Sequence, residues 1–267
     1  MASRRLRLPY APLLALLLAA CTAHGDPARP IPTAFLAAPQ PATRVFVVLP
    51  GRSDDLRRLR RSGVADAIQS TWPDTDVVFA ELTIDYYLKS DAPRRLHDEV
   101  VAPLRARGYR EVWLAGPSLG GLGSLVYDRT YPQDIDGLVL LAPYLGDAPV
   151  IAEITAQGGV TAWRPPPPEG PSPQNWQRDL WRHVQAWSRD PTRTHNVWLA
   201  YGDSDPLRIA QPLLEPFIPP GHVLVRPGGH SWDVWTPALR EILQAQVPAH
   251  SASAPLPAAP APTPHTH

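Results

Sequence analysis

The 267-residue chain contains one cysteine, Cys21, and one lysine, Lys89, and its 25 basic residues are balanced by 25 acidic ones. A single cysteine excludes a disulfide within the chain. A formal net charge of zero provides no global basic field that would recruit nucleic acid, and the composition is not that of an acidic, disordered chain. The sequence therefore predicts a soluble body without nucleic-acid partners.

Continuous apolar runs are also scarce, and the main one occupies residues 8–20, behind a start that contains Arg4, Arg5 and Arg7. A basic start followed by a short apolar run is typical of a secretory signal, and the run is too short for a membrane span. We therefore predict a signal peptide over residues 1–20.

The signal ends in Leu18-Ala19-Ala20-Cys21, which resembles the lipobox of bacterial lipoproteins, in which the cysteine is acylated and becomes the mature amino terminus. The resemblance implies a membrane anchor on Cys21 and gives a use to the only cysteine of an exported chain. Because Thr22 replaces the aspartate associated with inner-membrane retention, it further implies an outer-membrane lipoprotein that faces the periplasm of a Gram-negative host. The alternative is a plain signal peptide cut nearby, with Cys21 discarded.

Two segments are rich in proline and alanine and poor in large apolar side chains. Such a composition favours extended linkers. We therefore predict a lipidated amino terminus and linker over residues 21–43 and a disordered tail over residues 248–267. The remaining residues 44–247 suffice for one domain with a full sheet-and-helix core.

Strand-like and helix-like stretches alternate within this domain. Six strands are predicted near residues 44–49, 76–80, 111–115, 137–141, 197–200 and 223–225, and helices over residues 54–69, 92–107 and 122–131. This alternation predicts an α/β fold with a doubly wound, mostly parallel sheet. Reactive residues in such a sheet lie beyond the carboxyl ends of the strands.

The pattern Gly116-Pro117-Ser118-Leu119-Gly120 lies between a predicted strand and a predicted helix. That context turns a bare G-x-S-x-G match into a candidate nucleophile elbow, a strained corner that presents a serine. The flanking glycines carry no Cβ that would collide where the strand turns into the helix. Ser118 is therefore the candidate nucleophile.

Two more polar turns follow predicted strands, one over residues 201–206 and one over residues 227–232. A serine hydroxyl is a poor nucleophile at neutral pH and needs a base within reach, a role that suits a histidine held by a carboxylate. The second turn supplies His230 as the base. The first supplies two candidate acids, Asp203 and Asp205.

The order of serine, aspartate and histidine along residues 44–246 resembles that of an α/β-hydrolase. The acid motif Gly-x-x-Asp of that family matches Gly202 to Asp205, so the resemblance implies Asp205 as the acid, with Asp203 as the alternative. It also implies an oxyanion hole formed by the backbone N–H groups of Leu119 and Arg52, with Ser53 as an alternate donor. Two early strands of the family have no clear counterpart, which predicts a trimmed fold.

The stretch of about residues 144–194 is too long for an ordinary connection. Within it, Trp176, Leu180, Val184 and Trp187 fall on one helical face. In the family a cap covers the active site at this point, so the resemblance implies a small aromatic lid and a substrate pocket with Tyr144 and Trp232. The alternative is that this tryptophan stripe packs on the domain core.

Together these residues predict a serine esterase that cleaves a small-molecule carboxylic ester through an acyl-enzyme, tethered to the cell envelope by Cys21. The alternatives are an acyltransferase or thioesterase with the same triad, and a non-catalytic envelope protein that uses the fold as a binding module. No metal-binding loop is evident, and no glycine-rich phosphate motif follows the first strand. We therefore predict neither a metal nor a cofactor.

Overall fold

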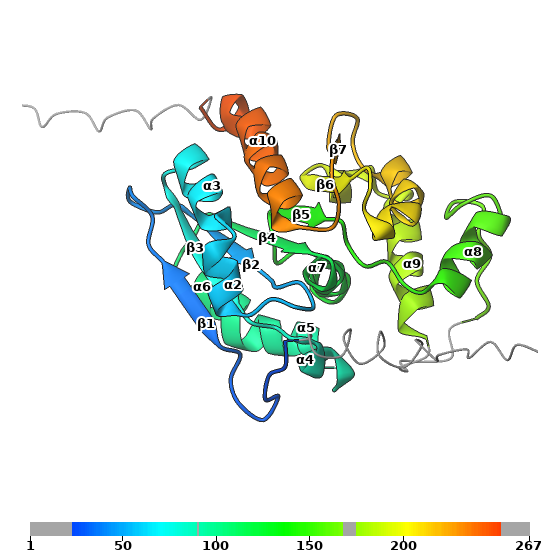
Figure 1. Ribbon diagram of the computed structural model, residues 1–267, viewed down its shortest axis with the longest axis horizontal. Coiled ribbons are helices and arrows are strands. Elements are labelled where there is room, and N and C mark those ends of the chain that lie inside the picture. Colours follow the sequence, from blue (N-terminus) through cyan, green and yellow to red (C-terminus); the bar gives the residue numbers. More distant parts are fainter. Residues whose placement is uncertain (1–22, 90, 168–174, 252–267) are drawn as a thin grey trace, which may run out of the picture.

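The computed structural model describes residues 23–89, 91–167 and 175–251 (Figure 1). The predicted signal peptide, Cys21 and most of the predicted tail lie outside these residues. The last helix continues to Ser251, past the predicted domain end at residue 247.

The described residues form a seven-stranded sheet in the order β1-β3-β2-β4-β5-β6-β7. Its strands are β1 (Thr33–Leu36), β2 (Arg44–Val48), β3 (Thr75–Ala80), β4 (Glu111–Pro117), β5 (Gly137–Leu141), β6 (Val197–Gly202) and β7 (Val223–Arg226). The edge strand β1 runs antiparallel to β3, and all other neighbours are parallel. The predicted α/β fold and its six parallel strands are confirmed.

Helices cover both faces of the sheet. They are α2 (Leu56–Arg61), α3 (Val64–Thr71), α4 (Ile84–Leu88), α5 (Ala92–Leu96), α6 (Ala102–Ala106), α7 (Leu119–Thr130), α8 (Ala148–Ala156), α9 (Trp176–Trp187) and α10 (Trp232–Ser251). Short 3₁₀ turns occupy Pro191–Thr194, Pro206–Ile209, Gln211–Leu213 and Glu215–Phe217. On one face α3 packs against α10, where the Trp72 indole donates to the Leu243 carbonyl (3.2 Å), while α5 and α7 lie together on the opposite face (Figure 1).

The central strands are buried on both faces, because parallel strands between two helical layers have no contact with water. Residues 45–49 and 112–115 have no solvent exposure. Phe46, Trp72 and Trp113 form an aromatic cluster with ring centroids 5.2–6.4 Å apart. Each such buried side chain contributes roughly 1.5–3 kcal/mol, which keeps the strand ends in fixed relative positions.

Two predicted helices differ in detail from the observed ones. The helix predicted over residues 54–69 is split into α2 and α3, because Gly63 between them adopts a left-handed conformation (φ 73°) that interrupts a right-handed helix. The helix predicted over residues 92–107 contains a π-helical turn, His97–Val101, between α5 and α6. Pro103 follows this turn and lacks the N–H that a regular helix would use there.

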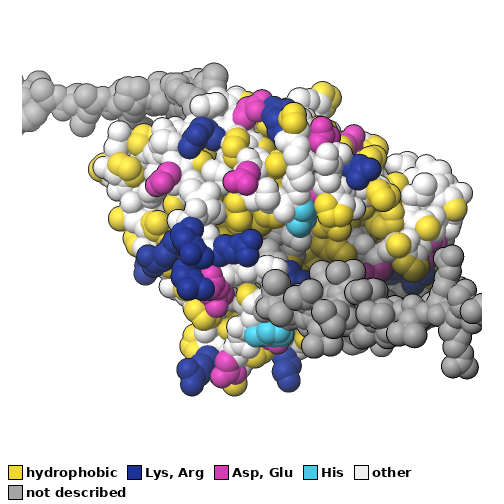
Figure 2. Space-filling model, viewed as in Figure 1, with side chains coloured by type: hydrophobic (Ala, Val, Ile, Leu, Met, Phe, Trp, Pro, Cys, Tyr) yellow, Lys and Arg dark blue, Asp and Glu magenta, His cyan; other side chains and the backbone are white. Residues whose placement is uncertain are grey.

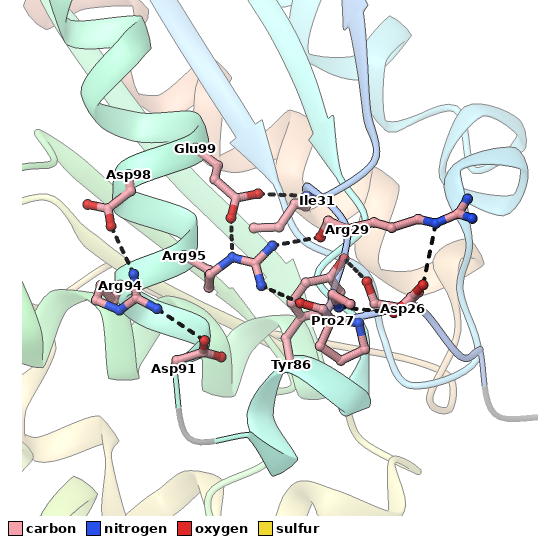
Figure 3. Close-up of polar contacts among 11 residues, drawn as sticks. Asp26, Pro27, Arg29, Ile31, Tyr86, Asp91, Arg94, Arg95, Asp98 and Glu99 are labelled. Carbon is pink, nitrogen blue, oxygen red and sulfur yellow. Dashed lines mark hydrogen bonds and ion pairs between the residues drawn. The ribbon is translucent and has the colours of Figure 1, made fainter.

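The described part of the predicted linker, residues 23–43, is not an extended linker, and this prediction was wrong. The segment contributes β1, and Ile31 and Ala34 are buried. Figure 3 shows how its backbone is held: Arg95 donates to the carbonyls of Pro27 (2.6 Å) and Arg29 (2.7 Å). Glu99 in turn accepts the Ile31 N–H (2.7 Å). A segment with few large side chains is therefore fixed by hydrogen bonds to its backbone, and it supplies an early edge strand that the sequence did not predict.

The insertion between β5 and β6 carries α8 and α9, and its tryptophan stripe packs inward. Trp181, Leu180, Val184 and Trp187 are all buried, and the Trp181 indole donates to the Leu145 carbonyl (2.9 Å). Only Trp176, at the start of α9, remains half-buried. Of the two interpretations of this stripe, packing on the core is the one observed.

Candidate active site

The central strand β4 ends at Pro117 and α7 begins at Leu119, so Ser118 alone makes the corner. Its backbone angles, φ 54° and ψ −114°, lie in a region that L-residues rarely occupy and that costs on the order of 1–3 kcal/mol. The corner is held from both sides. The Ser118 N–H donates to the Leu141 carbonyl (2.9 Å), and its own carbonyl accepts from Leu122 (3.1 Å) and Tyr144 (3.0 Å).

Glycines make this corner sterically possible. A Cβ on Gly116 would lie 2.5 Å from the backbone of Gly120, and a Cβ on Gly120 would lie 2.7 Å from the Leu49 carbonyl oxygen. Both distances are shorter than any tolerated contact. The first turn of α7 therefore packs directly against the chain that leaves β2, which brings the loop containing Arg52 to the nucleophile elbow.

His230 follows β7 and lies against the acid expected from the sequence. Its Nδ1 is 2.7 Å from Oδ2 of Asp205, whose side chain is fully buried and whose Oδ1 accepts the Leu207 N–H (2.7 Å). A neutral imidazole that donates its Nδ1–H to this carboxylate keeps the lone pair on Nε2. The ring of Trp235 meets the His230 ring edge-on, at a right angle and 4.7 Å between centroids.

The other candidate acid, Asp203, does not contact His230. Its carboxylate accepts the Gly228 N–H (3.1 Å) and the Ser204 hydroxyl (2.9 Å), and the first of these bonds is the main reason that its pKa lies below the ordinary value. Gly202 lies against the same turn, since a Cβ there would be 2.2 Å from the Gly228 oxygen. Asp203 therefore fixes the two turns to each other, and Asp205 is the acid that reaches the imidazole.

The described residues show no hydrogen bond between the Ser118 hydroxyl and His230. Contacts of this type are often long in unliganded enzymes and shorten in the substrate complex. Ser118 and His230 both remain partly exposed, which leaves them accessible from solvent.

The loop after β2 holds Arg52, one of the two predicted oxyanion donors. The Gly51 carbonyl accepts the Asp54 N–H (3.0 Å), and the Arg52 carbonyl accepts the Ala23 N–H (2.9 Å). In the described part of the chain, the N–H groups of Arg52 and Leu119 donate to no other group. Both are therefore available as donors, and Leu119 has the further advantage of the first position of α7, where helical N–H groups have no partner.

Asp54 is buried beneath this loop with 4% exposure. Its carboxylate accepts the Gly51 N–H (3.0 Å) and the Trp232 indole N–H (3.1 Å), and it pairs with Arg58 (3.1 Å). Burial raises the pKa of Asp54, because the cost of removing the charge from water exceeds the lowering by these donors.

The two predicted pocket residues, Tyr144 and Trp232, are held near Ser118 and His230 by different contacts. Tyr144 is tied to Ser118 through its backbone N–H, its hydroxyl donates to Asp147, and its ring lies 6.1 Å from that of Trp176. Burial is the main cause that raises the pKa of Tyr144. Trp232 lies two residues after His230 and stacks edge-on against Trp235 (5.5 Å). Both side chains are half-buried.

Reasoning from the sequence missed Asp54 and Trp235. Trp235 had a signal, because it lies one helical turn after Trp232 and so extends the same aromatic face. Asp54 had none, because an aspartate after a strand and before an arginine-rich helix is indistinguishable from an exposed helix cap.

Outside this site, a cavity of about 330 Å³ opens at the amino-terminal ends of β5 and β6, where Gly137, Val197 and Arg193 are among the lining residues. It lies at the edge of the sheet opposite to Ser118, Asp205 and His230. No cluster of metal-ligating side chains occurs among the described residues. None of the helices in that part of the chain is both long and apolar enough to span a bilayer.

On the face shown in Figure 2 charge is mixed, and a basic cluster lies over α2. Arg57, Arg58, Arg60 and Arg61 are exposed there, while Leu59 of the same helix is buried.

A strained serine after the central strand, an acid after β6 and a histidine after β7, all at one edge of a parallel sheet, define an α/β-hydrolase. The chain belongs to the Esterase family, described as “Putative esterase”, whose model matches residues 85–245. It is accordingly a carboxylic ester hydrolase, and its substrates are small-molecule esters.

Solved structures of related fold include Est1E from Butyrivibrio proteoclasticus, at 16% identity and a TM-score of 0.53, with 83% of this chain and 94% of that chain covered. S-formylglutathione hydrolase (FrmB) from Staphylococcus aureus matches at 13% identity and a TM-score of 0.53, with coverage of 82% and 98%. The metagenomic α/β hydrolase MGS-MChE2, from lagoon sediments of Mar Chica, Morocco, matches at 15% identity and a TM-score of 0.50, with 86% of this chain and 99% of that chain covered. Identities this low show a common fold alone. A comparison with curated proteins finds no match.

Proposed function

We propose that this ester hydrolase works through an acyl-enzyme formed on Ser118, with His230 as general base and Asp205 as the acid that orients it. The observation that carries the proposal is the 2.7 Å hydrogen bond from His230 to the fully buried Asp205. A carboxylate held at that depth fixes the imidazole in the tautomer whose Nε2 can accept a proton, and it stabilises the imidazolium that forms.

The reaction runs in two halves. As the Ser118 oxygen attacks the acyl carbon, His230 Nε2 takes the hydroxyl proton, and the carbonyl oxygen becomes an oxyanion that accepts from the N–H groups of Arg52 and Leu119. His230 then returns the proton to the leaving alcohol as the ester C–O bond breaks. Water, activated by the same nitrogen, attacks the acyl-serine and releases the carboxylic acid.

A fluorophosphonate probe tests this mechanism. It should label Ser118 in the wild type and fail to label Ser118→Ala, while His230→Ala should be labelled much more slowly. Turnover of a short-chain aryl ester should fall by about 10⁴-fold or more in Ser118→Ala. A folded wild-type protein that hydrolyses the ester without being labelled would contradict a serine acyl-enzyme.

We also propose that the exported protein is anchored in the cell envelope, as an outer-membrane lipoprotein facing the periplasm, by a lipid on Cys21. The support is the sequence Leu18-Ala19-Ala20-Cys21 after a signal-like start. Ala23, two positions later, is bound to the Arg52 carbonyl. A lipid on Cys21 would therefore tether the enzyme by the side that carries the oxyanion loop.

The anchor is tested by cell fractionation. Cys21→Ser should move the protein from the membrane to the soluble fraction while hydrolysis of the aryl ester stays unchanged. Tight membrane association of Cys21→Ser would show that lipidation is not the anchor.

A further inference from the structure

Two loops that come from opposite ends of the domain sequence meet at one buried carboxylate. The loop of residues 50–55 follows β2 and carries the Arg52 donor, whereas the loop of residues 227–232 follows β7 and carries His230. Asp54 accepts from both of them: from the Gly51 N–H at 3.0 Å and from the Trp232 indole at 3.1 Å.

The contact with Gly51 fixes the direction of the peptide that presents the donor. Asp54 binds both polar groups of Gly51, the N–H through its carboxylate and the carbonyl through its own N–H (3.0 Å). In a trans peptide the C=O and the following N–H point in opposite directions. A Gly51 carbonyl aimed at Asp54 therefore aims the Arg52 N–H away from Asp54.

The contact between Gly51 and Asp54 is close enough to exclude a side chain at position 51. A Cβ on Gly51 would lie 2.9 Å from Oδ2 of Asp54 and 3.8 Å from the Pro117 ring, which adjoins Ser118. The loop is thus confined between the carboxylate and the nucleophile elbow. A side chain at position 51 would displace the buried carboxylate, whereas the Pro117 ring is at ordinary contact distance.

The second contact extends to the base. Trp232 is two residues beyond His230, and its ring packs edge-on against Trp235, which packs in the same way against the imidazole. A hydrogen bond that fixes the indole therefore supports the aromatic surface on which His230 rests. With 4% exposure, Asp54 has little water to replace a lost partner.

We infer that Asp54 is a positioning residue that fixes the oxyanion loop relative to the histidine loop. The Arg52 N–H and the His230 imidazole are thereby both placed around the same reacting acyl carbon. The inference rests on the proposed function, because it assumes that Arg52 donates to an oxyanion and that His230 is the base. It assigns Asp54 no contact with substrate.

The test measures kcat, KM and thermal stability on an aryl ester for Asp54→Ala, Asp54→Asn, Trp232→Phe and the double variant Asp54→Ala/Trp232→Phe. Asp54→Ala should lower kcat by about 10- to 100-fold with a smaller change in KM, since a displaced donor or base weakens transition-state binding. Asp54→Asn keeps one acceptor oxygen for Gly51 and Trp232, and Arg58 is exposed enough to turn away. It should therefore retain kcat within about threefold.

Trp232→Phe keeps an aromatic ring and removes only the indole N–H, so it reports on the register even if Asp54→Ala does not fold. It should lower kcat several-fold, and the double variant should be no worse than Asp54→Ala alone, because both changes break the same link. Asp66→Ala is the control. Asp66 is an exposed carboxylate in the first turn of α3, outside both loops, so its removal should leave kcat unchanged.

Fully additive losses in the double variant would overturn the inference, as would a lowered melting temperature of Asp54→Ala with unchanged kcat. Failure of the proposed mechanism would look different. In that case the wild type itself would resist the fluorophosphonate probe, whatever the Asp54 variants do.

Discussion

The Ser118 elbow and the amino-terminal segment of residues 23–43 are both fixed by hydrogen bonds to their backbones. They differ in the residues that make each structure possible, which lie beside the elbow in one case and far along the sequence in the other. The elbow is made possible by glycines two positions on either side of the serine. The amino-terminal segment is held by Asp85, Arg95 and Glu99, which lie 60–68 positions later. Close backbone packing that requires a glycine leaves a pattern in the sequence, whereas distant charge-to-backbone contacts leave none.

The elbow can be broken by one methyl group. In Gly120→Ala the added Cβ would lie 2.7 Å from the Leu49 oxygen and 2.8 Å from the Pro50 oxygen, both backbone atoms that cannot turn aside. We expect turnover of an aryl ester to fall by at least about 100-fold, because the clash separates α7 from the oxyanion loop. Val126→Ala, on the half-buried side of the same helix, should keep near-normal turnover. Wild-type kinetics in Gly120→Ala would contradict the close packing of this corner.

The amino-terminal segment can be released by one side chain. Arg95 is largely buried and donates to two backbone carbonyls, so Arg95→Ala should reduce the free energy of unfolding by about 2–4 kcal/mol. Arg94 is the neighbouring control: within the described part of the chain it pairs only with Asp91 and Asp98 (Figure 3), and its side chain is 57% exposed. Arg94→Ala should cost less than about 0.5 kcal/mol. Urea denaturation measures the free energy of unfolding of both variants. Equal losses in Arg95→Ala and Arg94→Ala would show that the segment is not held by Arg95.

A change in pH tests how Asp54 affects the free energy of unfolding, separately from its effect on kcat. Because burial raises the folded-state pKa of Asp54 above the ordinary 3.8, the stability that this group contributes is complete below that value and is lost as the pH rises through the folded pKa. Asp54→Asn does not titrate, so it should gain stability relative to the wild type between about pH 4 and neutrality. Denaturation at pH 4 and pH 7 measures the difference. A gain that is larger at pH 4 would contradict the raised pKa.

The smallest effect is expected at Asp203. Its carboxylate is solvent-exposed and fixes the turn before His230 without touching the imidazole. Asp203→Asn should reduce turnover by less than about tenfold, whereas Asp205→Asn should reduce it by about 10³- to 10⁴-fold. If Asp203→Asn gave the larger loss, the assignment of the acid would be wrong.

Much of the fold was predictable because its signals are periodic. Buried parallel strands appear as short apolar runs, and each polar turn follows one of them, so Ser118, Asp205 and His230 could all be placed at one edge of the sheet. The break at Gly63 was within reach of the same rules, because a glycine inside a helical pattern is a known point of interruption.

Other features depend on contacts that no periodicity reports. Composition alone suggested a linker where β1 lies, because the pairing of β1 with β3 depends on partners at Ala80 and Val77 and not on strong β-propensity of its own. Similarly, whether the tryptophans of α9 faced substrate or core depended on the shape of the surface beneath them. Asp54 was missed for the same reason, since burial of a charge is a property of its neighbours.

The carbonyl of Ser118 accepts the N–H of Tyr144, the residue at which the insertion between β5 and β6 begins. The insertion is thus attached to Ser118 at its first residue, and farther along the chain it is held to α7, where His183 Nε2 lies 2.7 Å from Oδ2 of Asp128. Because the donor is a backbone N–H, any residue except proline can occupy position 144 without loss of this support for the Ser118 corner.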